Sequence, residues 1–213
     1  MNFSPGGRGR RIRLLAAGLL AVAAAAIPAS AASASPSASA VQPVVHQAST
    51  VDPHLTSAQL GISMQVQQYD EWCWVASGAT IAAYKGVSVD QNSFCDLARG
   101  YPTGTACPNQ PGYLSWDQNA FSQLGINPGG ETGALSWGSV VGEINANRPV
   151  LTGIAWTSGG GHAEVIYGYD DASQAIYFGD PWPSDNRYNL MSYSSYVSNS
   201  SFIWDDSLYG IGG

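Results

Sequence analysis

Three side chains along this sequence could together attack an acyl group. Cys73 stands between two tryptophans, His162 follows a run of three glycines, and Asp180 precedes a proline. An imidazole can take the proton of a thiol, and a carboxylate can hold the imidazole in the orientation that this transfer needs. The three residue types predict nucleophilic catalysis, with Cys73 as nucleophile, His162 as general acid/base and Asp180 as the residue that orients the histidine.

The number of cysteines sets Cys73 apart. The chain has three, and an odd number in an exported protein leaves one thiol without a disulfide partner. Cys95 and Cys107 flank a glycine- and proline-containing loop, and a disulfide across it would stabilise the fold by roughly 3 kcal/mol through loop entropy. Cys73 is then the free thiol. An inert, buried cysteine is the alternative, because a free thiol also packs as a small apolar side chain.

Residues 72–84 are predicted to form the helix that positions Cys73. Asp70 would be its N-cap, and Gly86 would follow its last turn as the C′ residue. The small side chains of this segment leave no polar face, so we expect a buried helix. In the first turn, the helix dipole would favour a thiolate at Cys73. Asp70 and the glutamate after it oppose this, so the thiolate needs a cationic partner, for which His162 is the candidate.

The second half of the domain is expected to supply that partner from antiparallel strands. Strands are predicted at residues 150–156, 162–169 and 175–178. A hairpin between the last two brings His162, at the start of one strand, beside Asp180, at the end of the next. The glycines at 159–161 would let a substrate backbone approach closely. Taken singly, His162 and Asp180 are ordinary strand-end and turn residues, and only their occurrence together with Cys73 indicates catalysis.

A glutamine before Cys73 could complete the site. The side-chain amide of Gln67, with the backbone N–H of Cys73, would form an oxyanion hole for a tetrahedral intermediate. Gln68 is the second choice for this role. Both glutamines could equally be ordinary loop residues, since a glutamine before a cysteine is weak evidence by itself.

The remaining segments are expected to have structural roles. Residues 139–145 read as a short helix, and residues 189–213 as an edge strand with a tail. Five apolar residues are expected to form core between the two halves of the domain: Trp116, Leu124, Trp137, Val140 and Val141.

The N-terminus resembles an export signal. Residues 1–32 combine four arginines with a short, alanine-rich apolar run and small residues, which predicts a signal peptide and a secreted protein. Residues 33–51 read as a disordered leader, and residues 52–213 as one domain. The chain has 15 acidic and 8 basic residues, and removing the four signal arginines leaves a net charge of about −11. This argues against a nucleic-acid or membrane partner.

These motifs together resemble the papain-like cysteine peptidases, most closely the compact bacterial branch that includes secreted effector proteases of plant pathogens. The segment from Gln67 to Trp74 resembles the nucleophile motif of the family, Gly161 to Tyr169 its histidine strand, and Asp180-Pro181-Trp182 the position of its third catalytic member. Asp70 stands where the longer family signature has a cysteine. The interval from Cys73 to His162 is shorter than in large members, which suggests a compact one.

The resemblance implies an α+β fold in which a helical half, led by the cysteine helix, packs against a small antiparallel β half with the cleft between them. It also implies a monomeric thiol endopeptidase that acts on protein or peptide substrates through Cys73, His162, Asp180 and Gln67. No cofactor is expected, and one domain histidine with one free cysteine offers too few ligands for a metal. Two alternatives stay open: an acyltransferase or amidase with the same triad, and a non-catalytic secreted binding domain.

Overall fold

The computed structural model describes residues 56–213, so the predicted signal peptide and leader lie outside the described residues. Seven strands form one antiparallel sheet: β1 (Ser57–Gln59), β2 (Gly130–Thr132), β3 (Val150–Trp156), β4 (Gly161–Asp170), β5 (Ala175–Gly179), β6 (Tyr188–Ser192) and β7 (Phe202–Tyr209). The order is β2-β7-β3-β4-β5-β6, and β1 pairs with the end of β4. The predicted meander of three strands is confirmed as β3, β4 and β5.

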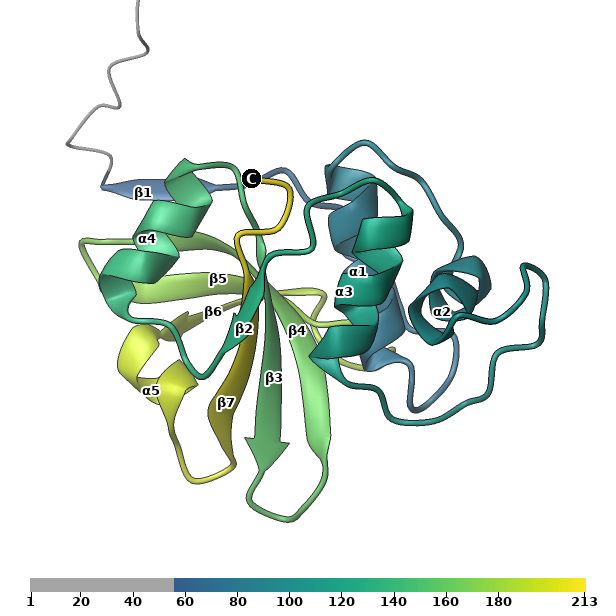
Figure 1. Cartoon of the computed structure of the whole chain (residues 1–213). Helices are drawn as coiled ribbons and strands as arrows, with labels where there is room; N and C mark the ends of the chain where they lie inside the picture. The colour runs from purple at the N-terminus through teal and green to yellow at the C-terminus, as the bar shows by residue number, and fades with distance from the viewer. Residues whose placement is uncertain (1–55) are drawn as a thin grey trace, which may run out of the picture. The chain divides into compact units, whose positions relative to one another are not determined.

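The helices lie in two groups around this sheet. They are α1 (Cys73–Tyr84), α2 (Gln91–Arg99), α3 (Leu114–Gln123), α4 (Trp137–Asn145) and α5 (Tyr193–Val197). The first three gather on one side of the sheet, where α1 packs against β4, and α4 and α5 lie toward the other side (Figure 1). This is the expected α+β arrangement of a helical half against a β half. Of these helices, α2, α3 and α5 had not been predicted, and α5 lies within the segment expected to be an edge strand with a tail.

The C-terminal segment matches the expected edge strand only in part, since β6 forms one edge of the sheet but no simple tail follows it. Strand β7 pairs with β3 on one side and with β2 on the other, so it lies inside the sheet. Phe202 and Trp204 alternate with exposed Ile203 and Asp205, as expected for a strand with one covered face. Its partner β3 lies far away in the sequence, and no local pattern specifies such a pairing.

Helix α1 begins later than its sequence suggests. Trp72, and not Asp70, is the N-cap residue, and no side chain caps the helix. The reason is a turn just before it, in which Trp72 N–H donates to the Tyr69 carbonyl at 3.0 Å and leaves Asp70 exposed within the turn. The N–H groups of the first turn are therefore not used by a capping side chain. At the other end, Gly86 has a φ of 87°, as expected for a C′ glycine.

The small side chains of α1 allow other helices to approach it closely. Nine of its residues, Trp74 to Ala82, are buried, which confirms the expected lack of a polar face. A Cβ atom at Gly78 would lie 2.3 Å from the ring of Phe94 on α2 and 2.4 Å from the carboxyl group of Asp117 on α3. Glycine at this position is thus required for the three helices to pack.

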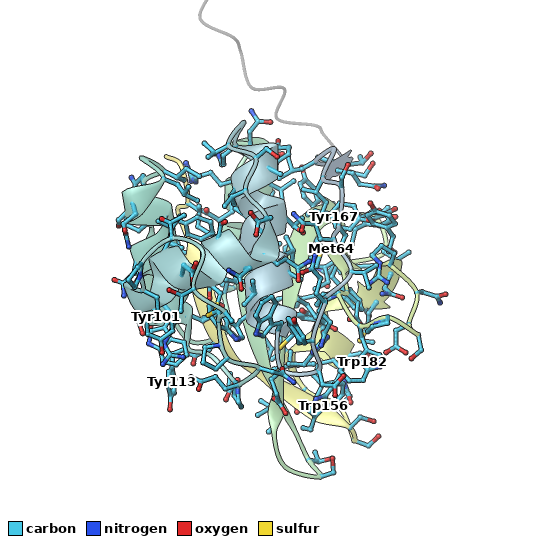
Figure 2. The ribbon with its side chains drawn as sticks, turned by 90° about the vertical axis from the view of Figure 1, so that its right-hand side faces the viewer. Met64, Tyr101, Tyr113, Trp156, Tyr167 and Trp182 are labelled. Carbon is cyan, nitrogen blue, oxygen red and sulfur yellow. A yellow bond between two sulfur atoms is a disulfide. The ribbon has the colours of Figure 1, made fainter. Side chains whose placement is uncertain are left out.

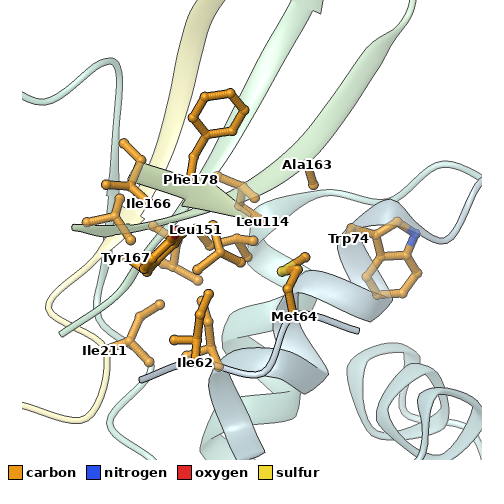
Figure 3. Packing of buried hydrophobic residues seen from close by; sticks show 14 of the residues in the cluster. Ile62, Met64, Trp74, Leu114, Leu151, Ala163, Ile166, Tyr167, Phe178 and Ile211 are labelled. Atoms are coloured by element: carbon orange, nitrogen blue, oxygen red, sulfur yellow. The ribbon is translucent and has the colours of Figure 1, made fainter. Parts of the chain in front are cut away.

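One apolar core joins the two halves. Figure 3 shows Trp74 and Leu114 of the helical half in the same cluster as Leu151 and Ile166 of the sheet. Of the five predicted core residues, Val140 is fully buried, and Trp116, Leu124, Trp137 and Val141 are partly buried against the cluster. Within residues 56–213, no helix is long and apolar enough to cross a membrane.

The predicted disulfide is present. Cys95 of α2 is joined to Cys107 in the loop before α3, with their Cα atoms 6.1 Å apart, and Cys73 is the free cysteine. Directly after the bridge, the carbonyls of Pro108 and Gln110 accept hydrogen bonds from the indole N–H groups of Trp72 and Trp74. The bridge therefore ties the loop that covers the start of α1.

Candidate active site

The β4–β5 hairpin brings His162 and Asp180 together. Val165 of β4 pairs with Gly179 of β5. His162 and Asp180 lie just beyond this pair, at the end of the hairpin where the two strands separate. His162 Nε2 lies 2.8 Å from Asp180 Oδ1, and both side chains are almost buried. The same carboxylate oxygen accepts the backbone N–H of Trp182 at 2.8 Å. Arg187 donates to the carbonyls of Asp180 and Trp182 and so fixes the loop that carries the carboxylate.

Cys73 reaches the same imidazole from the helical half. Its side chain interacts with His162 through hydrogen bonding and charge, and since Asp180 occupies Nε2, Nδ1 is the ring nitrogen left for the thiol. Burial lowers the pKa of His162, but the hydrogen bonds and negative charges of Asp180 and Cys73 outweigh it and raise this pKa from 6.5 to about 10. The surroundings therefore favour the imidazolium form of His162.

A cleft of about 800 Å³ opens above this pair, between the helical and the β half. Cys73 lies on one wall and His162 on the other. The predicted glycine turn lines the cleft, and Gly159 and Gly160 have φ angles of 95° and 85°, a conformation that suits glycine. These residues carry no side chain that would keep a bound chain away from the backbone.

Two tryptophans flank the imidazole, and sequence reasoning had assigned a role to neither ring. The rings of Trp156 and Trp182 both lie 6.3 Å from the ring of His162, the first nearly parallel and the second nearly perpendicular. Figure 2 shows these two side chains close together, with Tyr113 on the opposite side of the cleft. The rings exclude water from the imidazole and provide apolar surface at the mouth of the cleft.

The lining of the cleft is acidic. Among the described residues, no lysine or arginine faces it. Five carboxyl side chains do: Asp70, Glu71, Glu131, Asp205 and Asp206. Asp70 and Glu71 come from the turn before α1, as the sequence indicates, but the other three come from β2 and β7. Burial and the charge of Asp205 raise the pKa of Asp206. A cation in the cleft would relieve this repulsion.

The sequence predicts that the Gln67 amide lies in the cleft beside Cys73, but the structure places it elsewhere. Gln67 Nε2 donates to the carbonyls of Tyr69 and Asp70 at 2.9 and 2.8 Å, because the turn before α1 folds back over it. Its Oε1 is buried without a hydrogen-bond partner. The second choice, Gln68, is exposed and does not line the cleft either. In this state, the uncapped first turn of α1 presents the free N–H groups beside Cys73.

A second buried acid lies beside the pair and was not predicted from the sequence. Glu164 is 4% exposed, and its carboxyl group lies with His162 and Asp180 in a cluster whose possible ligand atoms are all within 4.8 Å of one another. Histidine and two carboxylates could hold a metal ion in principle. Here His162 and Asp180 are hydrogen-bonded to each other, and Glu164 accepts from Tyr196, so a metal would have to replace these bonds.

A helical half, a small antiparallel sheet and a cysteine–histidine pair between them define the class of papain-like cysteine peptidases. The sequence matches the family described as the papain-like cysteine protease AvrRpt2 over residues 56–201, and the chain belongs to this family. It is therefore a cysteine-type peptidase, and its substrates are peptides. No curated protein matches the sequence significantly.

Solved structures share the fold at low sequence identity. A C39-like peptidase from Bacillus anthracis superposes with a TM-score of 0.53 at 16% identity, over 72% of this chain and 96% of that one. The peptidase domain of Streptococcus ComA gives 0.49 at 17% identity, over 68% and 95% of the two chains. Xylellain, a cysteine protease from Xylella fastidiosa, gives 0.45 at 14%, over 72% and 85%. The first of these supports the papain-like fold.

Proposed function

We propose that this protein is an exported endopeptidase that cleaves peptide bonds through a Cys73–His162–Asp180 triad and an acyl-enzyme, and that it acts as a monomer. The observation that supports the proposal is the shared imidazole: Asp180 lies 2.8 Å from one ring nitrogen of His162, and Cys73, the free cysteine, interacts with the same side chain. Export is supported by the N-terminal sequence alone, with its arginines, apolar run and small residues.

In this mechanism, the Cys73 thiolate attacks the carbonyl carbon of the scissile bond, and the electron pair of the C=O bond moves to oxygen. The His162 imidazolium then gives its proton to the leaving nitrogen as the C–N bond breaks, which leaves a thioester on Cys73. The neutral imidazole next takes a proton from water, whose oxygen attacks the thioester. The C–S bond breaks, the peptide acid leaves, and the thiolate–imidazolium pair is restored.

The oxyanion needs hydrogen-bond donors near Cys73. The backbone N–H of Cys73 lies in a helical turn without a capping side chain and is the first candidate. Gln67 remains the candidate side-chain donor, but it must first release one of the two carbonyls to which its amide donates. The buried Oε1, which has no partner, favours such a rearrangement, because a buried unsatisfied oxygen is costly.

Product analysis tests the proposal. Purified protein without residues 1–32 is incubated with a mixed peptide library in the presence and absence of a primary amine, and the products are identified by mass spectrometry. Hydrolysis yields fragments with new carboxyl ends in both samples. Products that carry the added amine would show acyl transfer instead, and unchanged peptides with an unmodified Cys73 would favour a binding domain.

We expect the acidic cleft to select among peptides by charge. With lysine at the positions that flank the cut, kcat/KM should be about tenfold higher than with glutamate at low ionic strength, because opposite charges attract in a narrow cleft and like charges repel. The ratio should shrink as salt is added. It is measured with matched fluorogenic peptides at two salt concentrations.

Matched variants separate the cleft charges from the net charge of the protein. Asp205→Asn combined with Asp206→Asn should reduce the preference, because both side chains line the cleft. Asp171→Asn removes an exposed charge outside it and keeps an oxygen that can accept from Trp137, so the preference should not change. Equal cleavage of both peptides by the unaltered protein would contradict the expectation.

A further inference from the structure

The buried carboxyl group of Glu164 has no role in the mechanism above, although it lies beside the histidine. Glu164 and His162 are two residues apart on β4 and so point to the same face of the sheet. The pairing of Val165 with Gly179 places Glu164 next to Asp180, across the hairpin. The two carboxyl groups and the imidazole thus form one cluster, with possible ligand atoms within 4.8 Å.

A hydrogen-bond chain from distant elements holds this carboxyl group. Tyr196 of α5 donates to Glu164 Oε2 at 2.7 Å, and its hydroxyl lies 2.8 Å from Thr152 Oγ1 on β3. Both Thr152 and Tyr196 are fully buried. Burial raises the pKa of Tyr196 well above its usual range, so the phenol keeps its proton and remains a donor.

The charged neighbours of Glu164 act in opposite directions. The pKa of Glu164 is raised to about 7: burial and the charges of Asp180 and Asp185 raise it, and they outweigh the Tyr196 hydrogen bond and the charge of His162, which lower it. On the neighbouring strand β3, the residue opposite Glu164 is Thr152, which does not titrate. The carboxyl group therefore changes its charge in the neutral range, next to an imidazole that must stay protonated.

We propose that Glu164 is a positioning residue for the Cys73–His162–Asp180 triad. Held by Tyr196, Glu164 acts beside Asp180 as a second buried anion that stabilises the imidazolium of His162. The inference rests on the proposed function of the Cys73–His162 pair. Cys73 also interacts with the imidazole but is not part of the cluster of His162, Glu164 and Asp180. Ionised Glu164 therefore stabilises the imidazolium more than it destabilises the thiolate, and the reactive pair is favoured as this carboxyl group loses its proton.

The test uses the pH dependence of two rates: peptide hydrolysis and alkylation of Cys73 by iodoacetamide. In the unaltered protein, both should rise through a step near neutral pH. Glu164→Gln, a neutral side chain of the same shape, should remove the step, lower both rates about tenfold at pH 8, and move the loss of the imidazolium to lower pH by about one unit. Tyr196→Phe should keep the step but move it to higher pH, since the phenol stabilises the carboxylate.

Glu143→Gln is the matched control. Glu143 of α4 is also a buried glutamate, but it pairs with Arg148 at 2.8 Å and lies outside the cleft that holds Cys73. Its loss should leave the shape of both profiles unchanged. Glu164→Gln profiles that keep the step, or a Tyr196→Phe step that does not move, would overturn the proposal. Circular dichroism verifies folding, and if Glu164→Gln does not fold, the Tyr196→Phe shift decides.

The alkylation readout separates this inference from the proposed function. Alkylation needs only the thiolate, so a Glu164-dependent step in alkylation without any peptide cleavage would retain the positioning role and reject the peptidase mechanism. If all variants cleave peptides with identical pH profiles, the peptidase mechanism is retained and the positioning role of Glu164 is rejected.

Discussion

Cys73→Ala should abolish peptide cleavage. We expect kcat/KM to fall by at least about 10⁴-fold, because the acyl intermediate of the proposed mechanism forms on the Cys73 sulfur. The residue is only partly buried and lies at the start of α1, so the substitution should leave the melting temperature nearly unchanged. Activity is measured with a fluorogenic peptide and folding by thermal unfolding.

Two further readouts make this result specific. A thiol-directed epoxide should label the unaltered protein once and Cys73→Ala not at all, because Cys95 and Cys107 are joined in a disulfide. The pKa of His162 should also fall in the variant, since Cys73 contributes both a hydrogen bond and charge that raise it. Retained labelling or retained turnover would show that another group is the nucleophile.

Replacement of Asp180 has the second largest expected effect, and its size depends on the substituent. Asp180→Ala removes the acceptor of both His162 Nε2 and Trp182 N–H, so we expect kcat/KM to fall about 100-fold or more. Asp180→Asn keeps an oxygen that can accept from an imidazolium, which carries protons on both nitrogens. Its loss should be only about tenfold, and its activity should decline at lower pH, because the charge that raises the pKa of His162 is gone.

The same substitution should change how stability depends on pH. The pKa of His162 is about 10 in the folded protein and 6.5 in the unfolded chain, so the stability from its charged form is fully present below pH 6.5 and is lost as the pH rises toward 10. Asp180→Asn should flatten this decline, as measured by urea unfolding at a series of pH values. An unchanged decline, or equal activity losses for alanine and asparagine, would argue against the assigned role of Asp180.

Local sequence signals were sufficient for much of the site. The hairpin that joins β4 to β5 is formed by neighbouring segments, so the strand pattern alone places His162 beside Asp180, which the structure shows at 2.8 Å. The odd number of cysteines and the loop between Cys95 and Cys107 left Cys73 as the free thiol, as found. Helix α1 was recognised from its small residues, but its N-cap was not, because a turn precedes it.

Other features depend on contacts between distant segments and could not be derived from local patterns. Gln67 faces the turn instead of the cleft because two carbonyls of that turn satisfy its amide. Strand β7 lies inside the sheet because β3 and β2 pair with it. Asp205 and Asp206 line the cleft as a result, and nothing in their local sequence indicates this.

The sequence by itself determined the chemical groups of this protein: a free thiol at the start of a helix, and an imidazole and a carboxylate at the open end of one hairpin. Spacing along the chain specifies such local geometry. Only the tertiary structure decided what surrounds these groups, namely the two tryptophans beside His162, the acidic walls of the cleft, and Glu164 held by Tyr196. The physical reason is that burial and electrostatic coupling depend on distance in space, which the order of residues does not contain.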